Sequence, residues 1–356
     1  PHHPGWVSAP VFHEVTRTMV FLSSLPGRLA LVAALMLALP ACKAATPADA
    51  GVDARSEAGA SSRVPLIEDG SRDGVGDLRF RGGVALTHPD KAFGGLSDFR
   101  VTEDGTAFAA VSDGAGIVTG RLRYDRDGDL VAAGEFQLSS LNGEAGAPLV
   151  GKDGDAEGLV RLPDGGWLVS IERDHRILRY GAGLGQGRPA RLDAPADLAS
   201  LPANGGLETL VRLADGRLLL IAEDGPEAPR TAAWIGTPGA WTRLSYQAEG
   251  PFRPVGGALM PDGDVLVLER RASFVGGWGS RIVRLRAADI DQAIATGGVL
   301  AGAEIGRLDP PMAVDNYEGI DVRRTSDGRI IVYLLSDDNF QATQRTLLLM
   351  FELRGG

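Results

Sequence analysis

One pattern is written five times along this chain: a short apolar run, the dipeptide Asp-Gly and a second apolar run. Asp-Gly between two such runs is a strong hairpin signal, because a tight turn between twisted strands needs a residue that accepts positive φ. The copies are spaced by 60, 51, 47 and 65 residues with only strand patterns between them, which indicates a β-propeller. The turn aspartates are Asp104, Asp164, Asp215, Asp262 and Asp327.

Each copy is followed by two more strand patterns, except the last, which has only one before the chain ends. The missing strand is supplied by residues 77–86, so the two ends of the domain are expected to share a blade and leave no open edge. The count predicts an all-β propeller of five four-stranded blades, with six possible if a divergent blade escaped the pattern. A short helix is expected only over residues 287–298, in a blade connection.

Residues 17–42 have the pattern of an export signal. Arg17 and Arg28 are basic, and the apolar run from Leu29 to Leu39 is long enough for a signal core but too short to span a membrane. The run ends in Leu-Pro-Ala-Cys, which resembles the lipobox of bacterial lipoproteins, in which Cys42 would carry the lipid. An ordinary secretory signal is the alternative. Both predict export; the first places the protein on the periplasmic face of the outer membrane.

The export signal divides the chain into three segments. Residues 1–42 are the leader, and residues 43–75, rich in Ala, Gly, Ser and Asp without an apolar period, are expected to be a flexible linker. Residues 76–356 form the propeller. The membrane is then reached only through the lipid anchor, and the protein is expected to be a monomer.

Composition excludes several kinds of site. The net charge of −10 argues against nucleic acid, whose phosphates need basic patches. Cys42 is the single cysteine, so no disulfide and no cysteine-based zinc site can form within the chain. Only His88 and His175 lie outside the leader, which excludes a histidine-rich metal centre. His175 is expected to be a solvated loop residue.

Charged residues recur where the strand before each Asp-Gly turn begins and the strand after it ends. Because the two strands are antiparallel, these ends lie on one face, opposite the turns, and converge on the mouth of the central channel. The start of the first strand contributes Glu157, Glu208 and Glu318. The end of the second strand contributes Glu172, Arg173, Glu223, Asp224, Glu269, Arg270 and Arg271.

Two interpretations of these charges remain open. They can form a solvated rim, since loop ends are usually wet. They can also form a polar cup, in which carboxylates suit Ca²⁺ or Mg²⁺ and guanidinium groups grip phosphate or carboxylate. Recurrence at one strand position in several blades favours the cup. Trp278, in a Gly-rich loop on the same face, is a candidate to stack on a ligand.

The copies "DAEGLVRLPDGGWLVSIERDHRILRY" and "NYEGIDVRRTSDGRIIVYLLSDDN", with "GGLSDFRVTEDG", resemble the family known for the esterase-like activity of phytase. The resemblance covers residues 77–353 and implies an exported bacterial propeller that hydrolyses phosphoric or carboxylic esters. Blade four departs from the pattern, since it has Val-Gly-Gly where blades two and five have Glu-Gly. The family-like positions are Glu157, Glu172, Arg173, Glu269, Arg270 and Glu318.

These observations give one main hypothesis, an ester hydrolase assisted by a divalent cation, expected to be Ca²⁺, that acts on a small anionic or ester substrate. Two alternatives remain: a non-catalytic ligand-binding or envelope scaffold, and a Ca²⁺-dependent lactonase. The predicted catalytic residues are Glu157 or Glu318 for the water, and Arg173 and Arg270 for the anionic group. The predicted metal ligands are Glu208, Glu223 and Asp224. The predicted substrate-binding residues are Glu172, Glu269, Arg271 and Trp278.

Overall fold

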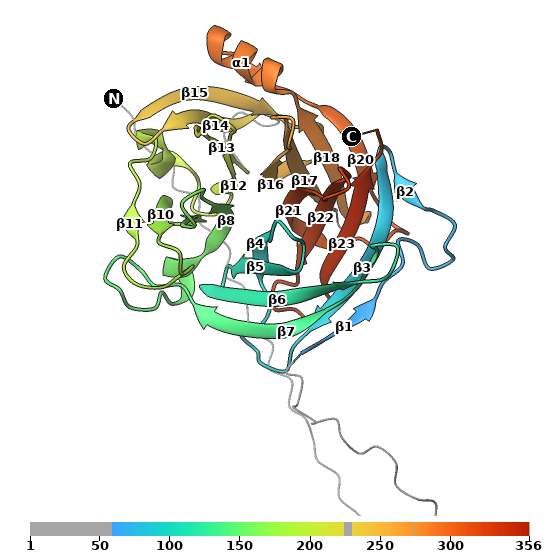
Figure 1. The fold of residues 1–356 in the computed structure, drawn as a ribbon. Coiled ribbons are helices and arrows are strands. Elements are labelled where there is room, and N and C mark those ends of the chain that lie inside the picture. Colours follow the sequence, from blue (N-terminus) through green and yellow to red (C-terminus); the bar gives the residue numbers. More distant parts are fainter. Residues whose placement is uncertain (1–58, 224–229, 274, 356) are drawn as a thin grey trace, which may run out of the picture. The chain divides into compact units, whose positions relative to one another are not determined.

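Five sheets form the blades of a β-propeller in the computed structural model, which describes residues 59–223, 230–273 and 275–355 (Figure 1). The prediction of five four-stranded blades is therefore confirmed, and six blades are excluded. The leader, Cys42, most of the expected linker and Asp224 lie outside the described residues. Among the described residues, none of the helices has the length and apolar character needed to cross a membrane.

The blades follow one another along the chain. Blade one contains β4 (Leu96–Val101), β5 (Ala107–Ser112), β6 (Gly116–Tyr124) and β7 (Leu130–Ser140). Blade two contains β8 (Ala156–Arg161), β9 (Trp167–Ile171), β10 (Arg176–Tyr180) and β11 (Ala190–Arg191). Blade three contains β12 (Leu207–Arg212), β13 (Leu218–Ala222), β14 (Arg230–Thr237) and β15 (Ala240–Gln247), extended by β19 (Val299–Leu300).

The last two blades complete the ring. Blade four contains β16 (Arg253–Leu259), β17 (Val265–Ser273), β18 (Gly277–Leu285) and β20 (Ala303–Leu308). Blade five contains β21 (Asn316–Arg324), β22 (Ile330–Asp337), β23 (Thr346–Leu353) and β3 (Leu78–Thr87), to which β1 (Ala60–Arg63) and β2 (Gly74–Val75) are added. The helices are the expected α1 (Ala287–Thr296) and two short 3₁₀ turns, η1 (Gly151–Gly154) and η2 (Ala196–Ser200).

The strand before each Asp-Gly turn is the innermost strand of its blade. The inner strands β4, β8, β12, β16 and β21 contact one another in that order, and β21 contacts β4 to close the ring. Every turn glycine has positive φ, from 76° at Gly105 to 93° at Gly216 and Gly263, as the hairpin signal requires. Apolar residues from neighbouring blades, such as Leu266 and Val332, pack between the sheets.

Blade five joins the two ends of the described domain, as predicted. β23 pairs with β3 in antiparallel register, with Leu348 opposite Val84. The expected linker over residues 43–75 is wrong in its last part, because β1 pairs with β3 and Leu66 is buried. This outer strand is mostly exposed, so it needs no apolar alternation to hold its place, and its sequence therefore resembles a linker.

Candidate functional site

Every inner strand has a β-bulge close to the end opposite its Asp-Gly turn. The register shifts fall on Ser97, Glu157, Glu208, Val255 and Glu318. A bulge inserts an extra residue and re-aims its side chain, which is why bulges are common beside functional sites. Three of the five blades thus direct a glutamate toward the axis of the propeller, and the Val-Gly-Gly of blade four supplies no charge there.

The glycine after the bulge lets neighbouring inner strands approach closely. A Cβ at Gly256 would lie 2.3 Å from the backbone oxygen of Glu318, and one at Gly158 would lie 2.9 Å from Leu210 Cβ. Both distances are shorter than real Cβ contacts, so a side chain at either position would push the strands apart, and glycine after the bulge keeps the ring tight.

Carboxylates from four blades surround this end of the axis. Each is close enough to at least one other for their negative charges to repel. We call this group the acidic cup. Its members are Asp113, Asp155, Glu157, Glu172, Glu208, Glu223, Glu318 and Asp337.

Three members of the acidic cup can act together on a metal ion. Asp155, Glu157 and Glu172 are buried, and one ligand oxygen of each lies within 4.8 Å of the other two. Glu172 is fixed in place, because its Oε1 accepts the backbone N–H groups of Gly205 and Gly206 at 2.6 and 2.9 Å. An all-oxygen, multiply anionic donor set of this kind suits a hard divalent cation.

Glu157 and Glu208 are buried but lack donors. Within residues 59–223, 230–273 and 275–355, no hydrogen bond reaches either carboxylate. An ionised carboxylate buried without a partner is strongly unfavourable, so each must hold a proton or face a cation. Glu157 and Glu208 therefore lie where a cation would stabilise the site.

Arg270 supplies positive charge at the other side of the cup. Its guanidinium contacts Glu223 at 2.9 Å and Glu318 at 3.0 Å, and it donates to Asn316 Oδ1. Asn316 in turn donates from Nδ2 to Glu318 Oε1 at 2.9 Å. The ring of Trp278 lies 5.8 Å from the guanidinium of Arg270, so this predicted residue does reach the cup.

Arg173 lies beside the possible metal ligands and is held at one end only. Its Nε donates to Asp155 Oδ2, and its side chain is 35% exposed. In the described part of the chain its two terminal nitrogens make no hydrogen bond, which leaves them able to bind an anion. Its backbone has a φ of 65°, an uncommon conformation for a residue with a Cβ that often marks functional sites.

Burial and mutual repulsion raise the pKa values of the cup carboxyls. Burial raises the pKa of Glu318 to about 7, against the opposing charge of Arg270. Burial and the charge of Glu318 raise the pKa of Asp337 to about 9. Burial raises the pKa values of Glu157 and Glu208 well above their usual range, and neighbouring carboxylates add to the effect.

The metal-free protein should lose stability as pH rises. Because the folded pKa of Glu318, about 7, lies above its ordinary 4.5, the folded state holds a proton that the unfolded chain has released between these values. The contribution of this group to folding therefore falls across that window, and Asp337 extends it toward pH 9. In a chelator, the melting temperature is expected to be roughly 5–10 °C higher at pH 5 than at pH 8. A melting temperature that rises from pH 5 to pH 8 would contradict this.

Two predicted substrate-binding residues lie elsewhere. Glu269 is fully buried inside blade four, where it accepts the Tyr246 hydroxyl at 2.7 Å and pairs with Arg281. It is placed there because successive strand residues point to opposite faces, and its neighbour on the cup side is the one that reaches the cup. Arg271 instead pairs with Asp309 at 2.6 Å and packs over Phe252.

The structure also changes which acids are the candidate metal ligands. The predicted ligands Glu208 and Glu223 are not in the group with metal-ligand spacing, and Glu223 is engaged by Arg270. Glu157 and Glu172, predicted for water activation and substrate binding, are in that group. Sequence reasoning missed Asp155, although a signal existed: Asp155 and Asn316 each stand two residues before the bulge glutamate, and both reach the cup.

His175 was expected to be a solvated loop residue, and this is wrong. It is only 8% exposed, and its Nε2 contacts the Pro202 carbonyl oxygen at 2.9 Å. The ring lies against Gly206, where a Cβ would be 2.2 Å from Cε1. It therefore packs beneath the segment whose amides hold Glu172.

Comparison with known proteins gives one family match. The model of the family described as esterase-like activity of phytase matches residues 91–340. No curated protein matches the chain.

Solved structures with a similar fold are distant. A virginiamycin B lyase from Staphylococcus aureus is 12% identical, covers 82% of this chain and 99% of its own, and has a TM-score of 0.38. An aldose sugar dehydrogenase from Streptomyces coelicolor is 12% identical, covers 83% and 98%, and has a TM-score of 0.37. A protein from Dyadobacter fermentans is 12% identical, covers 84% and 96%, and has a TM-score of 0.39. None of these similarities bears on the substrate.

Proposed function

Since the chain belongs to the phytase-like family, described as having esterase-like activity of phytase, we propose that it is a Ca²⁺-assisted hydrolase of phosphoric or carboxylic esters. The reaction takes place in the acidic cup. The observation that carries this proposal is the buried triad Asp155, Glu157 and Glu172 with an incompletely bonded guanidinium, that of Arg173, beside it.

The triad would hold the cation. Two ligand oxygens on opposite sides of Ca²⁺ lie up to about 5 Å apart, whereas around Mg²⁺ they lie about 4 Å apart. The ligand oxygens of the three carboxylates lie within 4.8 Å of one another, a spacing that a Ca²⁺ site accommodates. When bound, the cation would supply positive charge for the developing oxyanion and lower the pKa of a nearby water.

Arg173 would orient the substrate. Asp155 fixes its Nε, so the two terminal nitrogens are presented as a pair beside the triad. A paired guanidinium edge matches two oxygens of a phosphate or carboxylate, and it holds that group without needing a further conformational change.

Glu318 would take the proton from the attacking water. A general base works best when its pKa is close to the working pH, and burial raises the pKa of Glu318 to about 7. Asn316 and Arg270 hold its Oε1 at 2.9 and 3.0 Å, which fixes the direction of the free oxygen.

A hydrolysis screen tests this proposal. The protein is assayed with p-nitrophenyl phosphate, p-nitrophenyl acetate and a γ-lactone, each with Ca²⁺ and with a chelator. Metal-dependent release of nitrophenol from one ester class is the expected result. Turnover of the lactone alone would indicate a lactonase. A folded protein without turnover of any substrate would support the binding scaffold instead.

We also propose that the protein is exported and anchored by a lipid on Cys42, as a monomer without nucleic-acid partners. The support is the signal pattern of residues 17–42 and the acidic charge. Replacing Cys42 by Ser is expected to release the protein from the membrane fraction. Retention of the variant in that fraction would contradict the anchor.

A further inference from the structure

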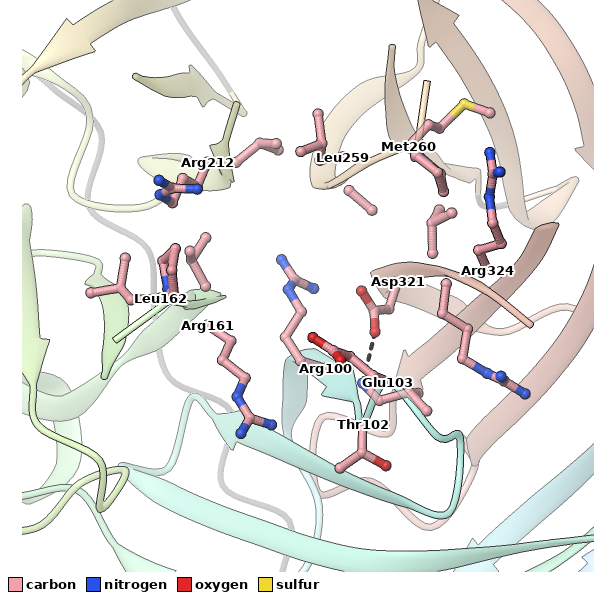
Figure 2. Close-up of a pocket in the computed structure, with 18 of the residues that line it drawn as sticks. Arg100, Thr102, Glu103, Arg161, Leu162, Arg212, Leu259, Met260, Asp321 and Arg324 are labelled. Carbon is pink, nitrogen blue, oxygen red and sulfur yellow. Dashed lines mark hydrogen bonds between the residues drawn. The ribbon is translucent and has the colours of Figure 1, made fainter. Parts of the chain in front are cut away.

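A second cavity lies at the end of the axis opposite the acidic cup, between the Asp-Gly turns. Its volume is about 1010 Å³, and all five inner strands line it (Figure 2). This size is at the upper end of the range for small-molecule sites. Whereas the cup is lined by acids, five of the residues that line this cavity are arginines and three are acids, in a chain whose net charge is −10.

Three of these arginines occupy one strand position. Arg161, Arg212 and Arg324 each stand three residues before the turn aspartate of their blade and line the cavity from three different blades. Arg161 and Arg324 are exposed, and Arg212 is half-buried. Figure 2 shows their side chains around the hollow.

The positive charge of these arginines is not neutralised. Over the described residues, none of the three forms an ion pair or a hydrogen bond; Arg161 only packs over Trp167 at 5.5 Å. Surface arginines elsewhere in the chain commonly pair with an acid, as Arg217 does with Asp215 at 2.6 Å. An unpaired set that recurs by blade is therefore unusual within this molecule.

The acids that line the cavity are mostly engaged. Asp104 accepts from Thr106 and Thr102 within its own turn. Asp321 accepts the backbone N–H of Val101 at 2.7 Å. These neutral donors leave the carboxylates charged, but the five lining arginines outnumber the three lining acids, so the cavity keeps an excess of positive charge.

Arg100 closes the floor of this cavity. Its guanidinium pairs with Asp98 on its own strand at 2.8 Å and reaches the carbonyl oxygens of Ile320 at 3.0 Å and of Gly257 at 3.2 Å on other blades. These partners belong to blades one, five and four. Because these bonds of Arg100 connect blades one, five and four between the two ends of the axis, the cavity is a site separate from the acidic cup.

We propose that this cavity binds a small anion that carries phosphate groups. Three guanidinium groups line the cavity from three blades, and an anion with several phosphate groups offers oxygens to more than one of them, whereas a single planar carboxylate offers two oxygens on one side. The ligand is small because the cavity is closed at Arg100. Free phosphate and a phosphorylated metabolite share this chemistry, and the size of the anion distinguishes them.

Isothermal titration of the full chain with sodium pyrophosphate tests the proposal. EDTA and low ionic strength are used, so that no cation occupies the acidic cup. One site is expected in the wild-type protein, with affinity that falls as salt is added. Arg161→Gln, Arg212→Gln and Arg324→Gln are each expected to weaken binding about tenfold, and the triple variant to show none.

Arg63→Gln is the matched control, because Arg63 is an exposed arginine on β1 that does not line the cavity. It should bind pyrophosphate like the wild type. Inorganic phosphate binding as tightly as pyrophosphate would identify free phosphate as the ligand class. Citrate binding more tightly than either, or a triple variant with wild-type affinity, would overturn the proposal. Ester hydrolysis should be unchanged in the triple variant, so this test fails or succeeds independently of the function of the cup.

Discussion

Glu318→Gln is expected to reduce kcat/KM for ester hydrolysis by about 10³-fold, because the side chain can no longer accept the proton of the attacking water. The amide is close in shape, and its oxygen can still accept from Asn316 Nδ2, which now lies 2.9 Å from Glu318 Oε1. Loss of activity would therefore reflect the missing base. The measurement is initial rate against pH, with Ca²⁺ at saturation.

The pH profile gives the more specific readout. Wild-type activity should fall at acid pH as Glu318 becomes protonated, with a midpoint at or below about 7, because a bound cation can only lower the pKa that burial has raised. The residual activity of Glu318→Gln should not show this fall at acid pH. Glu304→Gln, which removes an exposed carboxylate on β20, should keep both rate and profile. A Glu318→Gln variant that retained the wild-type fall at acid pH would show that another group is the base.

Arg270→Ala is expected to destabilise the fold by about 3–5 kcal/mol, the usual cost of leaving buried charges without their partner. Arg270 is the described cation that bonds both Glu223 and Glu318. At roughly 2–4 °C per kcal/mol for a large domain, the melting temperature should fall by roughly 6–20 °C. Thermal unfolding of the chelated protein at pH 8 measures this.

The loss should be smaller at pH 5 than at pH 8. Arg270 opposes the burial that raises the pKa of Glu318, so removing it raises that pKa further and leaves the carboxyl protonated at pH 5. Arg270→Lys should recover part of the stability, since it keeps the charge but not the paired bonds. Arg191→Ala breaks an exposed pair with Asp174 and should cost less than about 1 kcal/mol. Equal effects of Arg270→Ala and Arg191→Ala would refute the role of Arg270 in the cup.

The fold was predictable because each blade repeats the same sequence pattern, two apolar runs joined by Asp-Gly. Asp-Gly at the inner hairpin needs positive φ, and Gly105 and Gly216 adopt it. Closure by β3 and β23 followed from counting strands. β1 could not be predicted, because a mostly exposed outer strand such as Ala60–Arg63 is fixed by pairing and carries no apolar period.

The site was predictable in position but not in detail. Strand direction alone brings Glu157, Glu208 and Glu318 to one end of the axis. Which of two adjacent residues faces the cup depends on the bulges and strand register, so Glu269 was assigned to the wrong face. Asp155 stands before its strand begins, where the alternation of strand residues says nothing about side-chain direction.

Calcium titration of hydrolysis is the most direct test of the central claim. The protein is stripped with EDTA and dialysed, and Ca²⁺ is added back while the initial rate is followed on the ester class that responds in the screen. We expect no turnover before Ca²⁺ is added, and then a rise in rate that half-saturates at the Kd found for Ca²⁺ by calorimetry. A Glu157→Gln/Glu172→Gln variant should neither bind Ca²⁺ nor hydrolyse the ester. Full activity in EDTA, or Ca²⁺ binding that survives in this variant, would contradict the account.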